Sequence, residues 1–262
     1  MFMSLSRLLF IAVIYLGSVV QVQAKVRIAV TDWPPYYSKA DKNGGQQLAL
    51  LKSVFDKLGE TVEPVWFRTG VGALVKVRAN LLDAAAGWEC NKERANDFLF
   101  SDPIGYEQTV IFYHKDYDFD WRNVDDLNRD ITIGVTAHYA YGEELQNLLS
   151  MDKATVEISG SDRNNLDLLF RREIDLFLLD KNVGLDLIKQ AKVPLSKSIN
   201  MHPRPFRQNK VAIRLLVSRK HKDARAFIDK FNHALKEIRL QNSLSSIAPE
   251  KYDTCPKRNI TE

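Results

Sequence analysis

The sequence predicts an α/β protein built from two lobes, and three observations support this prediction. First, 262 residues exceed the usual size of a single domain, although 45% hydrophobic and 27% charged residues are ordinary for a globular chain. Second, strand and helix signals alternate along the chain after its first 24 residues. Third, the second half of the chain repeats this alternation, so we expect the two halves to be built alike.

The N-terminal segment, residues 1–24, is expected to be a signal peptide. Arg7 supplies a positive charge, residues 8–20 form an apolar run, and Val22-Gln23-Ala24 fits a cleavage site with small residues. Cleavage would leave a mature chain that starts at Lys25 in the periplasm. An uncleaved membrane anchor is the alternative, although the apolar run is shorter than most membrane spans.

In the first half of the chain, β-prone apolar runs predict strands at residues 26–30, 62–67 and 81–86. A helix is predicted between the first two strands, because apolar residues recur there at helical spacing before Gly59. These residues are Leu48, Leu51, Phe55 and Leu58. A second helix follows residues 70–72, whose two glycines form neither a dinucleotide fingerprint nor a P-loop.

In the second half, a β-prone run at residues 109–114, followed by a polar and aromatic stretch, is interpreted as the first crossing between the lobes. The elements expected after it are strands at residues 131–135, 155–158 and 176–179 and helices at residues 142–149, 166–170 and 183–191. Residues 211–218 are expected to cross back before a final helix at residues 223–240. Two crossings imply a hinge, and hinged lobes can close around a ligand.

Charge and motifs exclude several functions. The formal net charge of +4 is small, and Lys and Arg are scattered among acids, which argues against a nucleic-acid partner. The histidines are dispersed, and neither an H-E-x-x-H nor a C-x-x-C motif is present, so we expect no metal and no cofactor. The sequence also lacks a G-x-S-x-G nucleophile elbow. No catalytic residue is predicted from these motifs.

The candidate site is the stretch G-W-E-C-N-K-E-R-A-N-D-F-L-F-S-D-P at residues 87–103. It follows the third predicted strand, whose small residues let the backbone turn. Asn91 can cap a helical turn that contains Arg94, which places an arginine at the carboxyl end of a strand. Ligands bind at such strand ends in open α/β sheets, so we expect the ligand here.

This stretch resembles the family 3 periplasmic solute-binding proteins, which deliver amino acids and related small polar solutes to ABC transporters. T-D-W-P-P-Y-Y at residues 31–37 resembles that family's first strand and ligand loop. D-D-L at residues 125–127 with I-T-I-G-V at residues 131–135 resembles the start of its second lobe, and R-E-I-D-L at residues 172–176 through Asp180 resembles its late strand and pocket acid.

The resemblance implies the type II periplasmic-binding-protein fold, in which each lobe is a mixed sheet flanked by helices and two crossing strands join the lobes. The first lobe would then comprise residues 25–112 and 213–262, and the second lobe residues 113–212. Because the family's chain end returns to the first lobe, a disulfide between Cys90 and Cys255 is one expectation for an exported protein, and two free thiols are the other.

The resemblance also assigns charged ligand contacts. Arg94 matches the family arginine that holds a ligand carboxylate through its planar fork, with a structural salt bridge as the alternative. Asp180 matches the acid that receives the ligand's ammonium group, with a helix N-cap as the alternative. Asp32 matches a loop acid that either caps its turn or contacts the ligand. Arg68, directly after the second strand, is a candidate for a second positive contact.

Aromatic residues and departures from the family pattern complete the candidate site. Trp33 and Tyr36 would form an aromatic wall or pack in the core. Glu89 stands where amino-acid binders carry Ser or Thr, and it would either neutralise Arg94 or contact a cationic or hydroxyl-rich ligand. Tyr139 and Tyr141 lie where the family has a Gly-Thr-Thr anion loop. A small polar solute is therefore a safer prediction than a standard α-amino acid.

The expected function is capture of a small-molecule solute by a monomeric periplasmic protein, which hands it to the membrane permease of an ABC transporter. Two alternatives stay open. One is a ligand-sensing partner of a membrane sensor. The other is an enzyme like cyclohexadienyl dehydratase on the same scaffold, with Glu89 as general acid because burial raises the pKa of a carboxyl group.

Overall fold

The structure is a computed structural model that describes residues 24–123, residues 126–241 and Cys255. The predicted signal peptide, apart from Ala24, and Asp125 of the predicted second-lobe start lie outside the described residues. None of the helices in the described ranges is both long enough and apolar enough to span a membrane.

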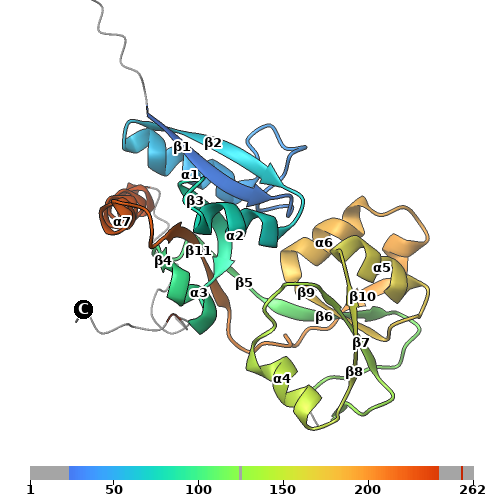
Figure 1. Cartoon of the computed structure of the whole chain (residues 1–262). Coiled ribbons are helices and arrows are strands. Elements are labelled where there is room, and N and C mark those ends of the chain that lie inside the picture. The colour runs from blue at the N-terminus through green and yellow to red at the C-terminus, as the bar shows by residue number, and fades with distance from the viewer. Residues whose placement is uncertain (1–23, 124–125, 242–254, 256–262) are drawn as a thin grey trace, which may run out of the picture.

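The first sheet is mixed, and its strands come from both ends of the chain (Figure 1). Strand β1 (Ala24–Thr31) lies between β2 (Glu60–Phe67) and β3 (Ala84–Glu89) and runs parallel to both. Strand β11 (Val211–Ser218) pairs antiparallel with β3, β4 (Phe98–Phe100) and β5 (Gly105–Glu107). The late strand β11 therefore joins the C-terminal part of the chain to this sheet.

Helices cover both faces of the first sheet, and the alternation of side chains in β1 explains how. Ile28 and Val30 pack with α1 (Gln46–Lys57) and α7 (Ala224–Gln241) in one core cluster. Ala29, which points to the opposite face, packs with α2 (Gly70–Arg78) in a second cluster. The short helix α3 (Lys92–Asp97) follows β3. We call this sheet and its helices the first lobe.

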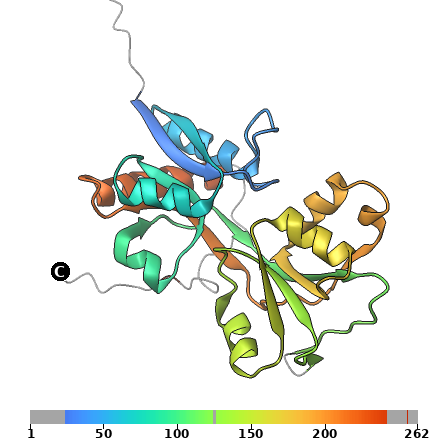
Figure 2. The same cartoon turned by 45° about the vertical axis from the view of Figure 1, so that its right-hand side comes forward.

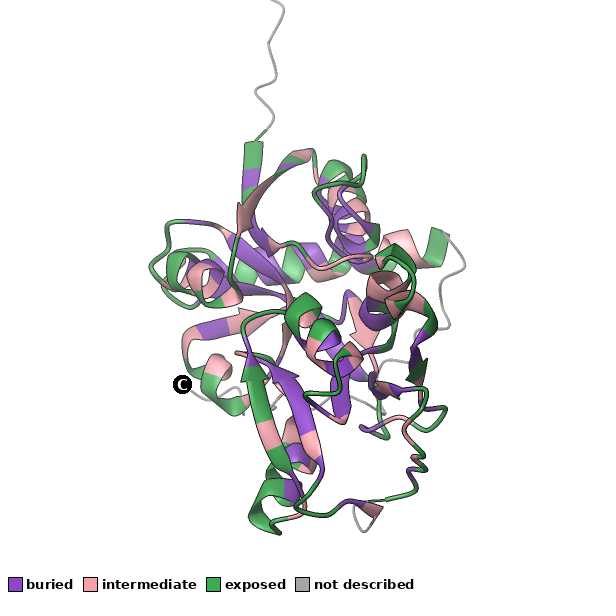
Figure 3. Ribbon diagram, turned by 90° about the vertical axis from the view of Figure 1, so that its right-hand side faces the viewer, coloured by how far each residue is buried: buried purple, intermediate pink, exposed green. Residues whose placement is uncertain are grey.

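The second sheet has the strand order β10-β6-β9-β7-β8. Its strands are β6 (Thr109–His114), β7 (Thr132–Thr136), β8 (Thr155–Ser159), β9 (Leu176–Asp180) and β10 (Ile199–Met201). Its helices are α4 (Gly142–Ser150), α5 (Asp162–Phe170), α6 (Lys181–Gln190) and the 3₁₀ turn η2 (Leu195–Lys197). Figure 3 shows β8 as a largely exposed edge beside the buried β7. We call this sheet and its helices the second lobe.

The chain passes between the two sheets at Gln108 and again within residues 202–210 (Figure 2). The sequence placed the first crossing in the run 109–114, but this run is β6, which pairs with β9 and β10 inside the second sheet. Likewise, Val211 and Ala212 pair with Glu107 and Tyr106 in the first sheet. We therefore propose lobe boundaries at these crossings instead of at residues 112 and 212.

Corresponding turns in the two lobes are closed in the same way by a carboxylate. Asp83 Oδ2 accepts a hydrogen bond from Arg27 N at 2.7 Å, and Asp83 N donates to Arg27 O at 3.1 Å. Asp175 Oδ2 accepts from Thr132 N at 2.8 Å, and Asp175 N donates to Thr132 O at 2.9 Å. Each pair ties the turn before a strand to the neighbouring parallel strand, so the two lobes share one local construction.

One predicted strand is displaced. The apolar run 81–86 predicted a strand beginning at Leu81, whereas β3 begins at Ala84 and continues to Glu89. Leu81 is 56% exposed, because the turn that Asp83 closes carries it away from the core. The shift extends β3 through Gly87, Trp88 and Glu89, which reach the site described next.

Candidate functional site

A cavity of about 760 Å³ lies between the two lobes, and residues of both lobes line it. Many of them follow the carboxyl ends of β1, β3, β7 and β9, where ligands bind in open α/β sheets. The lining includes residues 31–34, 68–70, 86–89, 136–141, 160–163 and 179–180. The cavity therefore brings the predicted ligand loops of both lobes together.

Arg94 lines the cavity from the first lobe. The Asn91 side chain caps α3 by accepting a hydrogen bond from Arg94 N at 2.8 Å, as the sequence predicted. The guanidinium lies 4.8 Å from the centroid of the Trp88 ring, and Nη1 donates to the backbone oxygen of Glu89 at 2.8 Å. Among the described residues no carboxylate forms an ion pair with Arg94, so the fork retains donors for an anion. Burial lowers the pKa of Arg94, although the negative charges of nearby acids act in the opposite direction and raise it.

Glu89 has a different partner from the one predicted. Its carboxylate accepts hydrogen bonds from Arg207 Nη1 at 3.3 Å and Arg207 Nη2 at 3.2 Å, with both side chains about 10% exposed (9% and 11%). The hypothesis that Glu89 neutralises Arg94 is therefore not supported by an ion pair. Arg207 lies on the second crossing, and the Arg207 backbone oxygen accepts from Gln108 Nε2 of the first crossing at 2.7 Å.

Asp180 ends β9 and receives four hydrogen bonds. Oδ1 accepts from Asn182 N and Val183 N at 2.9 and 3.1 Å, so Asp180 is the N-cap of α6 that the sequence offered as an alternative. Oδ1 also accepts from the Tyr36 hydroxyl at 3.1 Å, and Oδ2 accepts from Gln108 N at 2.9 Å. Burial raises the pKa of Asp180 even though these donors favour its ionised form. Asp180 lines the cavity with most of its acceptor capacity in use.

The loop after β1 presents an aromatic wall. Asp32 Oδ1 accepts from Lys39 N at 3.0 Å and so caps the loop, while its side chain also borders the cavity. The rings of Trp33 and Tyr36 lie 4.9 Å apart, and Trp33 meets Tyr139 of the second lobe edge to face at 6.4 Å. Tyr36 is only 5% exposed and reaches Asp180, so it packs behind Trp33.

The second-lobe loop contributes two tyrosines and an acid. The Tyr139 hydroxyl donates to Asp162 Oδ2 at 3.0 Å, and Thr136 Oγ1 donates to Asp162 Oδ1 at 2.6 Å. The Tyr141 hydroxyl accepts from Thr136 N at 2.7 Å, and burial raises the Tyr141 pKa. Phenol groups thus stand where the family resemblance placed an anion loop.

Two exposed arginines, Arg68 and Arg163, border the cavity from opposite lobes. Arg68 was predicted and Arg163 was not. Neither forms an ion pair within the described ranges, so both can contact an anionic ligand at the mouth of the cavity.

Glu107 is a cavity residue that sequence reasoning missed. It is the last residue of β5 and is paired with Val211 across the two crossings. Burial raises the pKa of Glu107 to about 8, and the charges of Asp180 and Glu89 add to the effect while Arg207 and Arg94 oppose it. The only local signal was an acid placed directly before the crossing.

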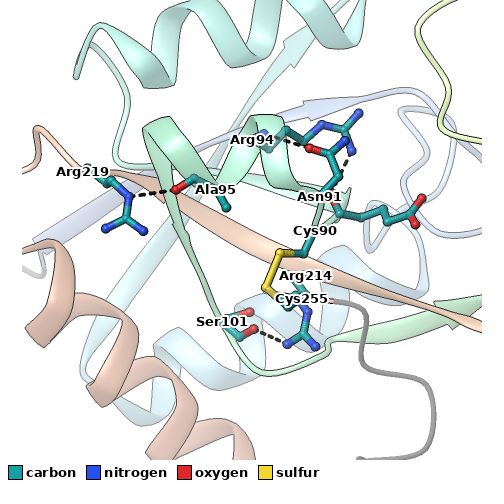
Figure 4. Close-up of a disulfide and its surroundings, with 9 residues drawn as sticks. Cys90, Asn91, Arg94, Ala95, Ser101, Arg214, Arg219 and Cys255 are labelled. Atoms are coloured by element: carbon teal, nitrogen blue, oxygen red, sulfur yellow. Dashed lines mark hydrogen bonds between the residues drawn. A yellow bond between two sulfur atoms is a disulfide. The ribbon is translucent and has the colours of Figure 1, made fainter. Parts of the chain in front are cut away.

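Cys90 and Cys255 form a disulfide, which confirms one of the two expectations (Figure 4). Their Cα atoms are 5.1 Å apart, and 165 residues separate them in sequence. Cys90 is buried between Glu89 and Asn91, so the bridge fixes the chain beside the cap that positions Arg94. No group of three or more metal-ligating side chains occurs among the residues that the structure describes.

Comparison with known proteins gives a family and a fold. A family model described as bacterial extracellular solute-binding proteins, family 3, matches residues 26–252. No curated protein matches the sequence. An ancestral arginine-binding protein bound to arginine matches with a TM-score of 0.69 and 20% identity, over 85% of this chain and 96% of that chain.

Two further solved structures share the architecture. A histidine kinase sensor domain with similarity to periplasmic binding proteins gives a TM-score of 0.70 at 16% identity, over 86% of this chain and 94% of that chain. An ancestral amino-acid-binding protein, a precursor of cyclohexadienyl dehydratase, gives a TM-score of 0.67 at 20% identity, over 85% of this chain and 92% of that chain. These likenesses confirm the predicted type II fold, and at such identities they establish the fold alone.

Proposed function

Because the chain belongs to the bacterial extracellular solute-binding proteins, family 3, we propose that it captures a small polar solute in the periplasm, an amino acid or a related compound, and delivers it to an ABC transporter. The solute binds in the cavity between the lobes, and the lobes close around it by bending at the two crossings. The family supports binding; the delivery step and the solute class are our proposal.

One observation carries this proposal. The guanidinium of Arg94 borders the cavity, is held by the ring of Trp88 and the backbone of Glu89, and has no carboxylate partner among the described residues. A partly buried arginine without an ion-pair partner is a strong site for a ligand carboxylate, because two parallel charged hydrogen bonds replace its lost hydration.

The test begins with mature protein, residues 25–262, in a thermal-shift screen against amino acids, polyamines, opine-type compounds and small carboxylic acids. A ligand that binds only the folded state raises the melting temperature by mass action. Arg94→Ala should weaken the binding of every carboxylate-containing ligand by roughly 30-fold or more, since the substitution removes one partner of a desolvated charge pair. Arg94→Lys should retain part of the affinity, because it keeps the charge but not the fork.

The matched control is Arg225→Ala, which removes an exposed arginine of α7 that does not line the cavity. It should bind like the wild type. Affinity that is unchanged in Arg94→Ala, with the melting temperature of the free protein preserved, would contradict the proposed carboxylate contact.

Transport and sensing are separated by an experiment in cells. Deletion of the gene should abolish uptake of the radiolabelled solute if the protein serves a transporter. Uptake that persists while the cell's response to the solute disappears would favour the sensing role, for which the likeness to a kinase sensor domain gives the scaffold but no further support.

The dehydratase alternative assigned the general-acid role to Glu89. Both carboxylate oxygens of Glu89 accept hydrogen bonds from Arg207, so this carboxylate is engaged by the protein itself and is not directed at a bound solute. Incubation of the mature protein with prephenate or arogenate should therefore give no product above the uncatalysed rate. Product formation would reinstate the enzyme hypothesis.

A further inference from the structure

Five acids among the described residues line the cavity, and four of them have hydrogen-bonding partners in the described part of the chain while one does not. Asp32 accepts from Lys39 N, and Glu89 is paired with Arg207. Asp162 accepts hydrogen bonds from two hydroxyl groups, and Asp180 accepts four hydrogen bonds. The side chain of Glu107 has neither a hydrogen bond nor an ion pair within the described part of the chain, although it borders the cavity.

The position of Glu107 is fixed by the hinge. It ends β5, it is paired with Val211 of β11, and the next residue, Gln108, crosses to the second lobe. Gln108 N donates to Asp180 at 2.9 Å, which anchors the backbone beside Glu107 to the second lobe as well. Glu107 therefore lines the cavity from the start of the first crossing, on neither ligand loop.

The surroundings of Glu107 are rich in negative charge and in phenol groups. Burial raises the pKa of Glu107 most, the charges of Asp180 and Glu89 add to the effect, and Arg207 and Arg94 oppose it. Burial likewise raises the pKa values of Tyr36, Tyr139 and Tyr141, and the charge of Glu107 adds a smaller contribution to each. Arg207 is paired with Glu89, and Arg94 stacks on Trp88, so among the described residues neither arginine forms an ion pair with Glu107.

We propose that Glu107 receives the cationic group of the solute, an ammonium or a guanidinium, while Arg94 holds the carboxylate of the same molecule. This inference rests on the proposed function and narrows the solute to molecules that carry both charges. Asp180, the acid that the family resemblance assigned to this role, is already committed to the cap of α6, to Tyr36 and to Gln108.

A proton balance follows from the proposal. With a pKa of about 8, Glu107 of the free protein is mainly protonated at pH 7. A cation favours the ionised form, so binding should release about 0.9 proton from Glu107 at pH 7 and about half a proton at pH 8. Because only the ionised fraction is competent, the apparent dissociation constant should fall by about fivefold between pH 7 and pH 8, a range in which the α-ammonium group of an amino acid stays charged.

The experiment uses isothermal titration calorimetry with two probe pairs that differ only in the α-ammonium group. The first pair is L-glutamine and 4-carbamoylbutanoate, and the second is L-arginine and 5-guanidinopentanoate. Glu107→Gln, an isostere of the protonated form, should weaken binding of the ammonium-bearing probe by roughly tenfold or more. Glu107→Gln should leave the affinity for 4-carbamoylbutanoate, which lacks the ammonium group, unchanged or higher. Titrations in two buffers of different ionisation enthalpy measure the released proton, which Glu107→Gln should abolish.

The outcomes separate this inference from the proposed function. Glu143→Gln, an exposed acid of α4, is the matched control and should behave as the wild type in every titration. Binding of zwitterionic probes that is equally strong in Glu107→Gln, or wild-type preference for the ammonium-free probes, would overturn the inference and leave the proposed function intact. Failure of every solute in the thermal-shift panel and of all four probes to bind would contradict both.

Discussion

Arg207 has a structural task at the scale of single residues, because it compensates the buried charge of Glu89. Both side chains are about 10% exposed (9% and 11%), and both carboxylate oxygens are bound. The pair spans 118 residues of sequence and joins β3 of the first lobe to the second crossing. Glu89 is therefore held in a fixed orientation, and its backbone oxygen is free to hold Arg94.

Removal of Arg207 should be strongly destabilising. Arg207→Ala leaves the Glu89 carboxylate buried without a partner, which costs about 3–5 kcal/mol of unfolding free energy. The double variant Arg207→Ala with Glu89→Gln should recover much of this loss, since no buried charge remains uncompensated. Urea denaturation at pH 7 measures both values. Lys210→Ala, an exposed residue of the same segment, is the control. If the double variant is as unstable as Arg207→Ala, the loss of unfolding free energy does not come from the unpaired charge of Glu89.

At the scale of elements, the turn from β3 to α3 is the unit that presents Arg94. Gly87 has φ of 87°, and a Cβ atom there would lie 2.8 Å from the Tyr37 ring, so β3 can pass the aromatic loop only with glycine. Three neighbours then contact Arg94. The ring of Trp88 lies against the guanidinium, the backbone oxygen of Glu89 accepts from Nη1, and the side chain of Asn91 accepts from the backbone nitrogen of Arg94. The arginine is positioned by one short, continuous segment.

The cap of α3 should therefore affect binding more than stability. Asn91→Ala removes the acceptor for Arg94 N and should destabilise this six-residue helix by roughly 1 kcal/mol. Because the helix carries the guanidinium, carboxylate probes should bind several-fold more weakly. Asn91→Asp retains the acceptor and should restore both properties. Parallel calorimetry and thermal unfolding measure the two effects, and equal affinity in Asn91→Ala and the wild type would argue against positioning by the cap.

Local patterns predicted the parts of the molecule that depend on local interactions. Strand β11 was predicted with its correct bounds, because all eight residues are buried and form one β-prone run. The short strands β4, β5 and β10 were missed, since three residues acquire strand geometry only by pairing with a distant strand. In the same way Asn91 and Arg94 were found within one turn, whereas the pairing of Glu89 with Arg207 leaves no trace in nearby sequence.

At the scale of the whole molecule, the loop after β1 makes direct contacts with the second lobe. Tyr36 donates to Asp180 and accepts from Asn182 Nδ2 at 2.9 Å, and Trp33 meets Tyr139 at the mouth. These contacts link the ligand loop after β1 to the start of α6 and to the second-lobe loop. A solute that inserts between Trp33 and Tyr139 therefore changes the same contacts that set the relative position of the lobes, which couples its binding to the proposed closure.

The disulfide stabilises this architecture from outside the cavity. The bridge between Cys90 and Cys255 closes a loop of 165 residues that contains the entire second lobe and both crossings. In the chain-entropy model, closing such a loop in the unfolded state is worth on the order of 5 kcal/mol. The bridge also lies next to Asn91, so it restrains the segment that holds Arg94 (Figure 4).

Replacement of Cys90 and Cys255 by Ser together should lower the melting temperature by roughly 10–20 °C, given the size of the chain. Wild-type protein treated with dithiothreitol should unfold at the same temperature as this double variant, which controls for the packing of the new hydroxyl groups. Because the β3–α3 turn loses an anchor, the double variant should also bind carboxylate probes more weakly at 20 °C, where it is still folded. Thermal unfolding followed by circular dichroism, with and without reductant, makes the comparison. If reduced and oxidised wild-type protein unfold at one temperature, the bridge does not stabilise the fold. Equal binding of carboxylate probes by the two forms would show that the bridge does not position Arg94 either.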